Sequence, residues 1–114
     1  MRIDGYRFGE IVIDGRTHDK DVLLYGDQVI DWWRVHRHRL QLVDVEGLLE
    51  QDPPPEVLIV GTGNSGLVDV PDKVVKDIQD RGIEVRVHRT QEACHVYNQL
   101  ADSKRTAAAL HLTC

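Results

Sequence analysis

The feature that most constrains the fold is an alternation of strand-like and helix-like segments that begins after three consecutive prolines. Val57 to Val60 have the length and β-branched character of a buried strand, and a glycine-rich loop follows them. A helix is predicted from about Pro71 to Asp80, with Gly82 ending it, and a second strand from Ile83 to Val87. Two strands joined through one helix predict a parallel unit with a right-handed crossover.

The same alternation continues to the end of the chain. A helix is predicted from about Gln91 to Ala101, with Thr90 as its N-cap, and a last strand from Ala107 to Leu112. A shorter helix is predicted before the prolines, from Leu42 to Glu50, with Asp44 as the candidate N-cap.

The first third of the chain has the pattern of antiparallel β-structure. Between residues 6 and 32, short β-prone segments at Glu10–Ile13, Val22–Tyr25 and Val29–Trp32 alternate with the pairs Asp14-Gly15 and Gly26-Asp27. Such pairs favour hairpins because aspartate and glycine tolerate the positive φ that tight turns require. The whole pattern predicts an α/β fold with an added N-terminal antiparallel portion.

Composition limits the class of protein. A chain of 114 residues with 41% hydrophobic residues is expected to form one domain spanning 1–114. The net charge of −5 argues against binding to nucleic acid or to an anionic membrane, and the apolar runs are too short for a membrane helix. Two cysteines make no disulfide framework and the N-terminus has no signal-like stretch, so we expect a cytoplasmic protein.

The loop at 61–66 matches the G-x-G-x-x-G spacing of dinucleotide sites. Two features argue against a cofactor. Leu67 to Val70 separate the glycines from the helix, and no acidic residue for a ribose follows the second strand, which ends at His88-Arg89-Thr90. We therefore predict no cofactor and consider an anion or a partner carbonyl as the ligand of this loop.

Trp32 to Arg39 concentrate both tryptophans with three arginines. This composition is typical of surfaces that hold partners by stacking and forked hydrogen bonds, and it also suits single-stranded nucleic acid. The acidic remainder of the chain disfavours nucleic acid. The alternative is structural, with one tryptophan in the core and solvated arginines around it.

The histidines and cysteines do not form a recognised metal pattern. His36 and His38 would share one side of an extended segment, and His111 with Cys114 could supply further soft ligands. The chain has neither C-x-x-C nor H-E-x-x-H spacing, so we predict hydrogen-bonded histidines and no metal. Cys94 is expected to be a buried, inert thiol on the last helix.

Seven elements in a fixed order resemble a known family. They are Tyr6-x-Phe8-Gly9, Trp33-Arg34, Val57 to Gly63, Gly82-Ile83-x-Val85, Thr90-x-x-Ala93, Tyr97-Asn98 and His111-x-Thr113-Cys114. Together they resemble the Mth-type domain, found in archaea and bacteria, in the animal adipogenesis-associated Mth domain-containing protein and in a mitochondrial complex I assembly factor.

The resemblance implies a three-layer fold with a mixed central sheet, and assembly or regulatory roles without an agreed reaction. It also directs attention to the crevice between the glycine loop and Arg89-Thr90, with Tyr97-Asn98 lining the same region. The predicted ligand- or partner-binding residues are Trp33, Arg34, Gly61, Thr62, Gly63, Asn64, Ser65, Gly66, Arg89, Thr90, Tyr97, Asn98, His111 and Cys114.

No catalytic residue is assigned, because spacing alone selects no catalytic set. The leading interpretation is a non-enzymatic binding or assembly module with a protein partner. The alternative is an enzyme that binds a small molecule or an anion in the crevice.

Overall fold

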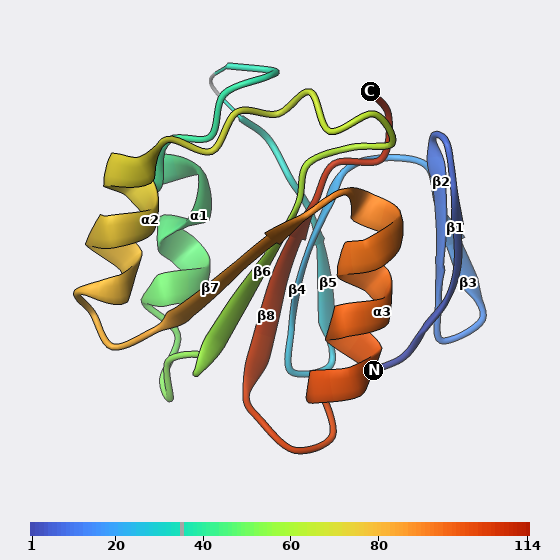
Figure 1. Ribbon diagram of the computed structural model, residues 1–114. Helices are drawn as coiled ribbons and strands as arrows, with labels where there is room; N and C mark the ends of the chain where they lie inside the picture. Colours follow the sequence, from blue (N-terminus) through green and yellow to red (C-terminus); the bar gives the residue numbers. More distant parts are fainter. Residues whose placement is uncertain (35) are drawn as a thin grey trace.

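In the computed structural model, which describes residues 1–34 and 36–114, the three strands of the predicted alternation join two strands from the first third of the chain in a five-stranded mixed sheet (Figure 1). The strands lie in the order β5-β4-β8-β6-β7. β6 pairs in parallel with β7 and β8, whereas β4 pairs antiparallel with β5 and β8. These strands are β4 (Val22–Tyr25), β5 (Gln28–Asp31), β6 (Val57–Gly61), β7 (Glu84–His88) and β8 (Thr106–Leu110).

Only the first part of the predicted antiparallel portion forms a separate sheet, of β1 (Ile3–Arg7), β2 (Glu10–Ile13) and β3 (Arg16–His18), because β4 pairs with β8 and so carries its hairpin with β5 into the main sheet. The predicted turn at Asp14-Gly15 is present, and both residues have positive φ, +48° and +78°. β1 begins before the predicted portion, and its pairing is irregular between Ile3 and Gly5. The polar strand β3 was not predicted, because it carries no apolar alternation.

The three described helices are α1 (Leu42–Leu49), α2 (Asp72–Gln79) and α3 (Thr90–Leu100). The predicted N-caps of α1 and α3, Asp44 and Thr90, both lie inside the helices in the structure. Gln41 is the N-cap of α1, and the Asp44 carboxylate, one turn inside the helix, accepts a hydrogen bond from the Gln41 N–H at 2.8 Å. Thr90 is the first residue of α3, because its hydroxyl bonds the Gly63 amide and the His111 carbonyl outside the helix.

The molecule has three layers. Every residue of β6 and β8 is buried, so these two central strands are covered on both faces. Ile59 and Ala108 pack on the side of α3 and the small sheet, whereas Leu58 and Ala109 pack on the side of α1 and α2. This confirms the predicted α/β class with a mixed central sheet. None of the helices in residues 1–34 and 36–114 is long and apolar enough to cross a membrane.

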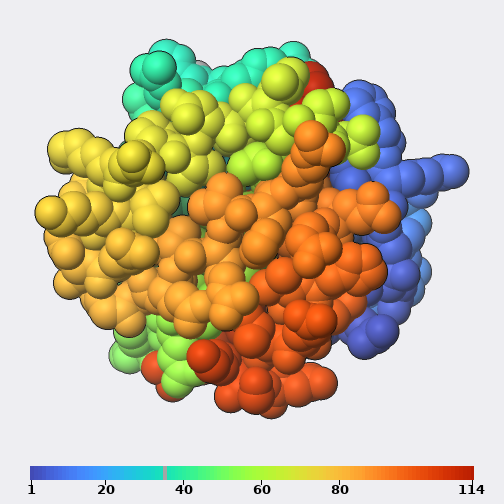
Figure 2. All heavy atoms as spheres, viewed as in Figure 1, coloured from blue at the N-terminus to red at the C-terminus, as the bar shows by residue number. Residues whose placement is uncertain are grey.

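The topology brings distant parts of the sequence to one edge of the sheet. Gly61 at the end of β6 lies in register with His88 of β7 and Leu110 of β8. In Figure 2, the segment after β5 (cyan-green), the loop after β6 (yellow-green) and the C-terminus (red) meet at one end of the molecule.

Candidate functional site

The segment after β8, residues 111–114, forms hydrogen bonds to the segments on both sides of it at this edge of the sheet. The His111 N–H donates to the Gly61 carbonyl at 3.0 Å, and the Asn64 N–H donates to the Thr113 carbonyl at 2.7 Å. On the other side, the Gly9 N–H donates to the Leu112 carbonyl at 2.7 Å. The C-terminal segment therefore joins the glycine loop to the N-terminal sheet.

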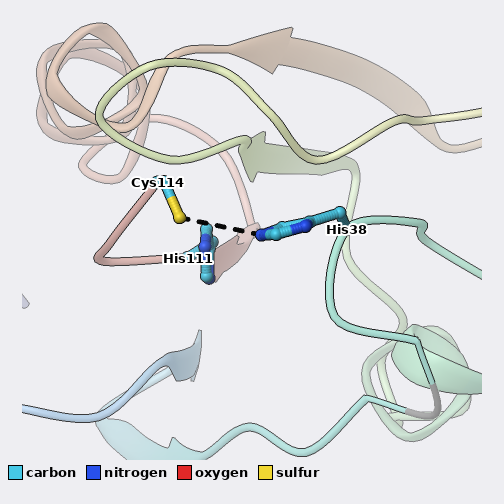
Figure 3. A group of neighbouring side chains, drawn as sticks. All are labelled: His38, His111 and Cys114. Carbon is cyan, nitrogen blue, oxygen red and sulfur yellow. Dashed lines mark hydrogen bonds between the residues drawn. The ribbon is translucent and has the colours of Figure 1, made fainter.

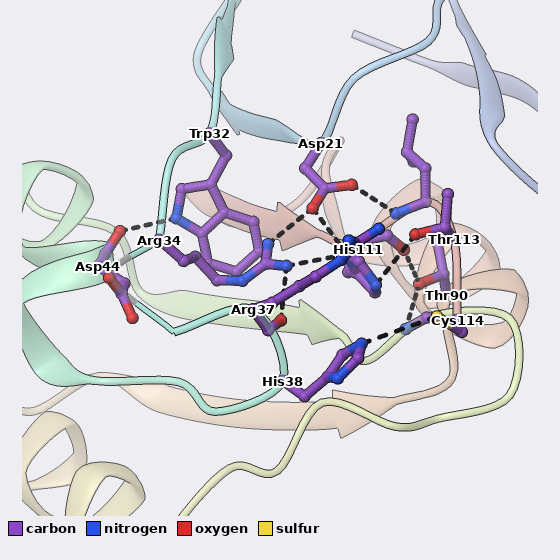
Figure 4. Close-up of polar contacts among 12 residues, drawn as sticks. Asp21, Trp32, Arg34, Arg37, His38, Asp44, Thr90, His111, Thr113 and Cys114 are labelled. Atoms are coloured by element: carbon purple, nitrogen blue, oxygen red, sulfur yellow. Dashed lines mark hydrogen bonds and ion pairs between the residues drawn. The ribbon is translucent and has the colours of Figure 1, made fainter.

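A largely buried network of Asp21, Arg34 and His111 lies beside this segment (Figure 4). Asp21 Oδ2 is 2.7 Å from both Arg34 Nη1 and His111 Nδ1. The exposed fraction of the side chain is 5% for Arg34 and 3% for His111. The Asp21 Oδ1 accepts from the Leu112 N–H at 2.8 Å, so both carboxylate oxygens are used.

Burial alone would raise the pKa of Asp21, but hydrogen bonds from His111, the Leu112 amide and Arg34 outweigh it and hold the pKa below its usual value. Asp21 is therefore an ionised acceptor at neutral pH. Because a carboxylate cannot donate, the proton of neutral His111 lies on Nδ1, and Nε2 keeps its lone pair. Arg34 Nη2, 3.0 Å from the same Nδ1, donates to the Arg37 carbonyl at 2.9 Å.

The ring of Trp32 packs against the Arg34 guanidinium. Its indole N–H donates to the Asp44 carbonyl at 2.8 Å, and the Arg34 guanidinium lies 4.5 Å from the centroid of its ring. Trp32 is buried, which agrees with the interpretation that one tryptophan fills the core. Arg34 differs from the solvated arginines of that interpretation, because its side chain is 5% exposed and contacts Asp21, Trp32 and the Arg37 carbonyl. Val35, part of the same predicted segment, lies outside the described residues.

Trp33, in contrast, is 79% exposed. It lines a pocket of about 420 Å³ together with Asp31, Trp32, Arg34 and His111. The pocket thus has an exposed aromatic side chain at its edge and the ion pair of Asp21 with Arg34 in its lining, where Arg34 Nε has no hydrogen-bond partner among the described residues.

The predicted crevice at the glycine loop is filled by the chain itself. The Thr90 N–H donates to the Gly63 carbonyl at 3.2 Å, and the Thr90 hydroxyl accepts from the Gly63 N–H at 2.9 Å while donating to the His111 carbonyl at 2.6 Å. The Thr62 N–H donates to the His88 carbonyl at 2.9 Å. An anion at these amides would have to displace hydrogen bonds within the protein.

The remaining loop residues lie at the surface. Asn64, Ser65 and Gly66 are exposed, and a Cβ on Gly66 would lie 3.4 Å from Arg89 Cγ. The loop and Arg89-Thr90 are therefore brought together as predicted, by direct packing.

Tyr97 and Asn98 are not brought to this edge. Tyr97 lines a hollow of about 570 Å³ with Tyr25 and Thr106, at the opposite end of the sheet. Asn98 bridges α3 to β1, accepting from the Ile3 N–H at 2.9 Å and donating to the Ile3 carbonyl at 2.8 Å. Tyr97 and Asn98 lie in the second half of α3, whereas Thr90 is its first residue, so the length of the helix keeps them away from the glycine loop.

The two cysteines differ in environment, and both are free thiols. Cys94 is buried, as predicted, and burial raises its pKa to about 12. Cys114 is partly exposed, and its Sγ lies 3.7 Å from His38 Nε2 (Figure 3). One donor atom each from His38, His111 and Cys114 lies within 4.8 Å of the others, so these side chains are the candidates for holding a metal.

Sequence reasoning missed Asp21, the centre of the network. No motif marks it. Its signal is positional, since Val22 of β4 pairs with Leu110 of β8, and the antiparallel register therefore places residue 21 opposite residue 111. Pairing of these two distant strands had to be known before the contact could be inferred.

The fold and site define a small three-layer α/β domain with an exposed tryptophan above a buried ionic network. The chain belongs to a family of proteins of unknown function, DUF498/DUF598, whose sequence model matches residues 3–111. Among solved structures, a conserved hypothetical protein from Pyrococcus horikoshii is 31% identical, with all of both chains covered and a TM-score of 0.86.

The family resemblance seen in the sequence is confirmed by two further comparisons. A Mth938-like domain protein of Bordetella pertussis shares the fold at a TM-score of 0.71 and 21% identity, over 97% of this chain and 85% of that one. The NADH dehydrogenase [ubiquinone] 1 alpha subcomplex assembly factor 3 of Danio rerio is 36% identical over 80 residues, or 68% of this chain. The match covers 44% of that relative, so this chain spans less than half of its length.

Proposed function

We propose that residues 1–114 act as a non-enzymatic protein-binding module of the assembly type, and that the partner is held at the pocket bordered by Trp33 and Arg34. The observation that carries the proposal is the contrast between Trp33, which is 79% exposed, and its buried neighbours Trp32 and Arg34. A large apolar ring is therefore exposed to water beside an arginine that is ion-paired and stacked on Trp32.

This arrangement is favourable for binding a protein. Tryptophan and arginine dominate binding energy at protein interfaces, most strongly where a rigid pocket excludes water. Because Arg34 is already ion-paired and stacked on Trp32, the floor of the pocket loses little conformational entropy when a partner arrives. The assembly role named for the Danio rerio relative supports the same class of function.

The second interpretation from the sequence, an anion bound between the glycine loop and Arg89-Thr90, receives less support. Its amides at Thr62, Gly63 and Asn64 donate to groups of the chain. We also propose a cytoplasmic location, which the two free thiols support, since a reducing compartment keeps cysteines in that state.

Affinity capture with the purified chain tests the proposal. We expect a stoichiometric protein partner whose affinity falls by at least about 30-fold on Trp33→Ala, corresponding to about 2 kcal/mol for an interfacial anchor. The matched control is Val87→Ala, which truncates an exposed apolar residue on β7, the edge strand opposite β5.

Two results would contradict the proposal. One is a partner whose affinity is the same for Trp33→Ala and for the wild-type chain. The other is a screen of nucleotides, phosphates and carboxylates in which one compound stabilises the protein by about 2.7 kcal/mol at 100 times its dissociation constant, while no protein partner is captured.

A further inference from the structure

Three soft or borderline metal-binding groups meet at the edge of the sheet from segments that are far apart in the sequence. His38 lies in the segment after β5, and His111 and Cys114 lie in the segment after β8. His38 Nε2 and Cys114 Sγ are 3.7 Å apart, and the two imidazole rings lie edge to face with centroids 6.1 Å apart (Figure 3).

The spacing is close to that of a zinc site. Zinc binds sulfur at about 2.3 Å and imidazole nitrogen at about 2.0–2.1 Å, so tetrahedral angles separate a sulfur and a nitrogen ligand by about 3.6 Å. The observed distance of 3.7 Å between Cys114 and His38 already has this value. The three donor atoms lie within 4.8 Å of one another, so the remaining approach is a side-chain adjustment of about 1 Å.

His111 is oriented for coordination through Nε2. Its Nδ1 hydrogen is held by Asp21 at 2.7 Å, which is the carboxylate–histidine arrangement that supports metal-binding imidazoles. Within residues 1–34 and 36–114, the Nε2 lone pair has only a long contact with the Thr113 hydroxyl, at 3.3 Å, and this hydroxyl can turn away. Since His111 is buried, its ring is held in this orientation.

Charge and access are compatible with a cation. Arg34, which lies against His111, is ion-paired with Asp21 at 2.7 Å. The Cys114 thiol would release its proton to solvent and contribute a negative thiolate on binding. His38 is exposed and Cys114 is partly exposed, so an ion can reach the donors from water.

We propose that His38, His111 and Cys114 form a three-ligand site for Zn²⁺, with Asp21 supporting His111 from behind and one coordination position open. Imidazole nitrogen and thiolate sulfur are both zinc ligands, and zinc sites with three protein ligands keep a fourth position open, whereas magnesium and calcium take oxygen ligands. The proposal replaces the sequence-based prediction of no metal. It concerns the isolated chain and does not depend on a protein partner.

The test uses untagged, metal-free protein under a non-chelating reductant, with Co²⁺ as a spectroscopic probe and Zn²⁺ as its competitor. We expect one equivalent of Co²⁺ to produce a sulfur-to-metal charge-transfer band, and one equivalent of Zn²⁺ to remove it. Cys114→Ser should abolish the band. His38→Gln should weaken Zn²⁺ binding more than Asp21→Asn, for which the expected loss is about 10–100-fold.

The matched control is His36→Gln, which removes an exposed imidazole two residues from His38 that is not among the proposed ligands. It should bind both metals as the wild type does. Circular dichroism of each variant confirms folding. Because His38 is exposed, His38→Gln should fold even if Cys114→Ser or Asp21→Asn does not, and it then still tests the site. The proposal is overturned if no band forms at one equivalent, if folded Cys114→Ser keeps the band, or if His36→Gln and His38→Gln weaken binding equally.

Discussion

Replacing Gly63 with alanine should destabilise the protein and displace the C-terminal segment. Gly63 has a φ of +106°, a conformation that favours glycine. A Cβ at this position would lie 2.5 Å from the Cys114 carbonyl oxygen and 2.9 Å from His111 Cδ2. The nearest obstacle is backbone, so the change cannot be accommodated by rotating a side chain.

The magnitude follows from two contributions. Holding an alanine in this region of φ costs about 1–3 kcal/mol. Moving the C-terminal segment away would also break the hydrogen bonds from the Asn64 N–H to Thr113 at 2.7 Å and from the Leu67 N–H to Cys114 at 3.1 Å. The two hydrogen bonds contribute about 1 kcal/mol each, so the expected loss in the free energy of unfolding is about 3–5 kcal/mol.

Urea unfolding of Gly63→Ala and Gly47→Ala measures this effect. Gly47 lies in α1 with open space around its Cα, so alanine there should stabilise the protein by about 0.5–1 kcal/mol through helix propensity. The melting temperature of Gly63→Ala should fall by at least about 10 °C. A Gly63→Ala protein as stable as wild type, with an unchanged m-value, would refute the steric reasoning.

Three further predictions concern particular side chains. Asn98→Ala should lower the free energy of unfolding by about 1–3 kcal/mol by removing both hydrogen bonds to β1, and leave partner affinity unchanged; a loss of affinity in folded protein would return this residue to the site. Iodoacetamide should label Cys114 and spare Cys94 in native protein, since burial raises the Cys94 pKa to about 12, and mass spectrometry showing equal labelling would contradict this. Arg34→Met should cost about 3 kcal/mol in urea unfolding because it leaves the Asp21 carboxylate without its ion-pair partner, and a variant of wild-type stability would show that the pair is dispensable.

The sequence predicted the elements whose pattern is local. The apolar run at Val57–Val60, the turn at Asp14-Gly15 and the helix after Pro71 were each confirmed, because strand periodicity and turn chemistry depend on neighbouring residues. The caps of α1 and α3 were misassigned for a physical reason. The Thr90 hydroxyl can cap a helix or bridge the Gly63 amide to the His111 carbonyl, and the tertiary contacts decide between the two.

The site was predicted only in part, because it is assembled by strand order. Trp33, Arg34 and His111 were chosen individually from composition and resemblance, and the structure places them around one pocket. Asp21 has no neighbouring motif and becomes visible only when β4 is known to pair with β8. The glycine spacing at 61–66 suggested a ligand loop, but spacing carries no information on whether the amides are already bonded.

Site-specific photo-crosslinking tests most directly whether the Trp33 face is the binding surface. A photoreactive phenylalanine analogue is placed at residue 33 in one variant and at residue 87 in another, since Trp33 and Val87 are both exposed apolar positions and β7 is the edge opposite β5. Illumination in native lysate should give a discrete protein adduct from position 33 and none from position 87. An adduct of the same protein with equal yield from both positions, or from position 87 alone, would contradict the proposed binding surface.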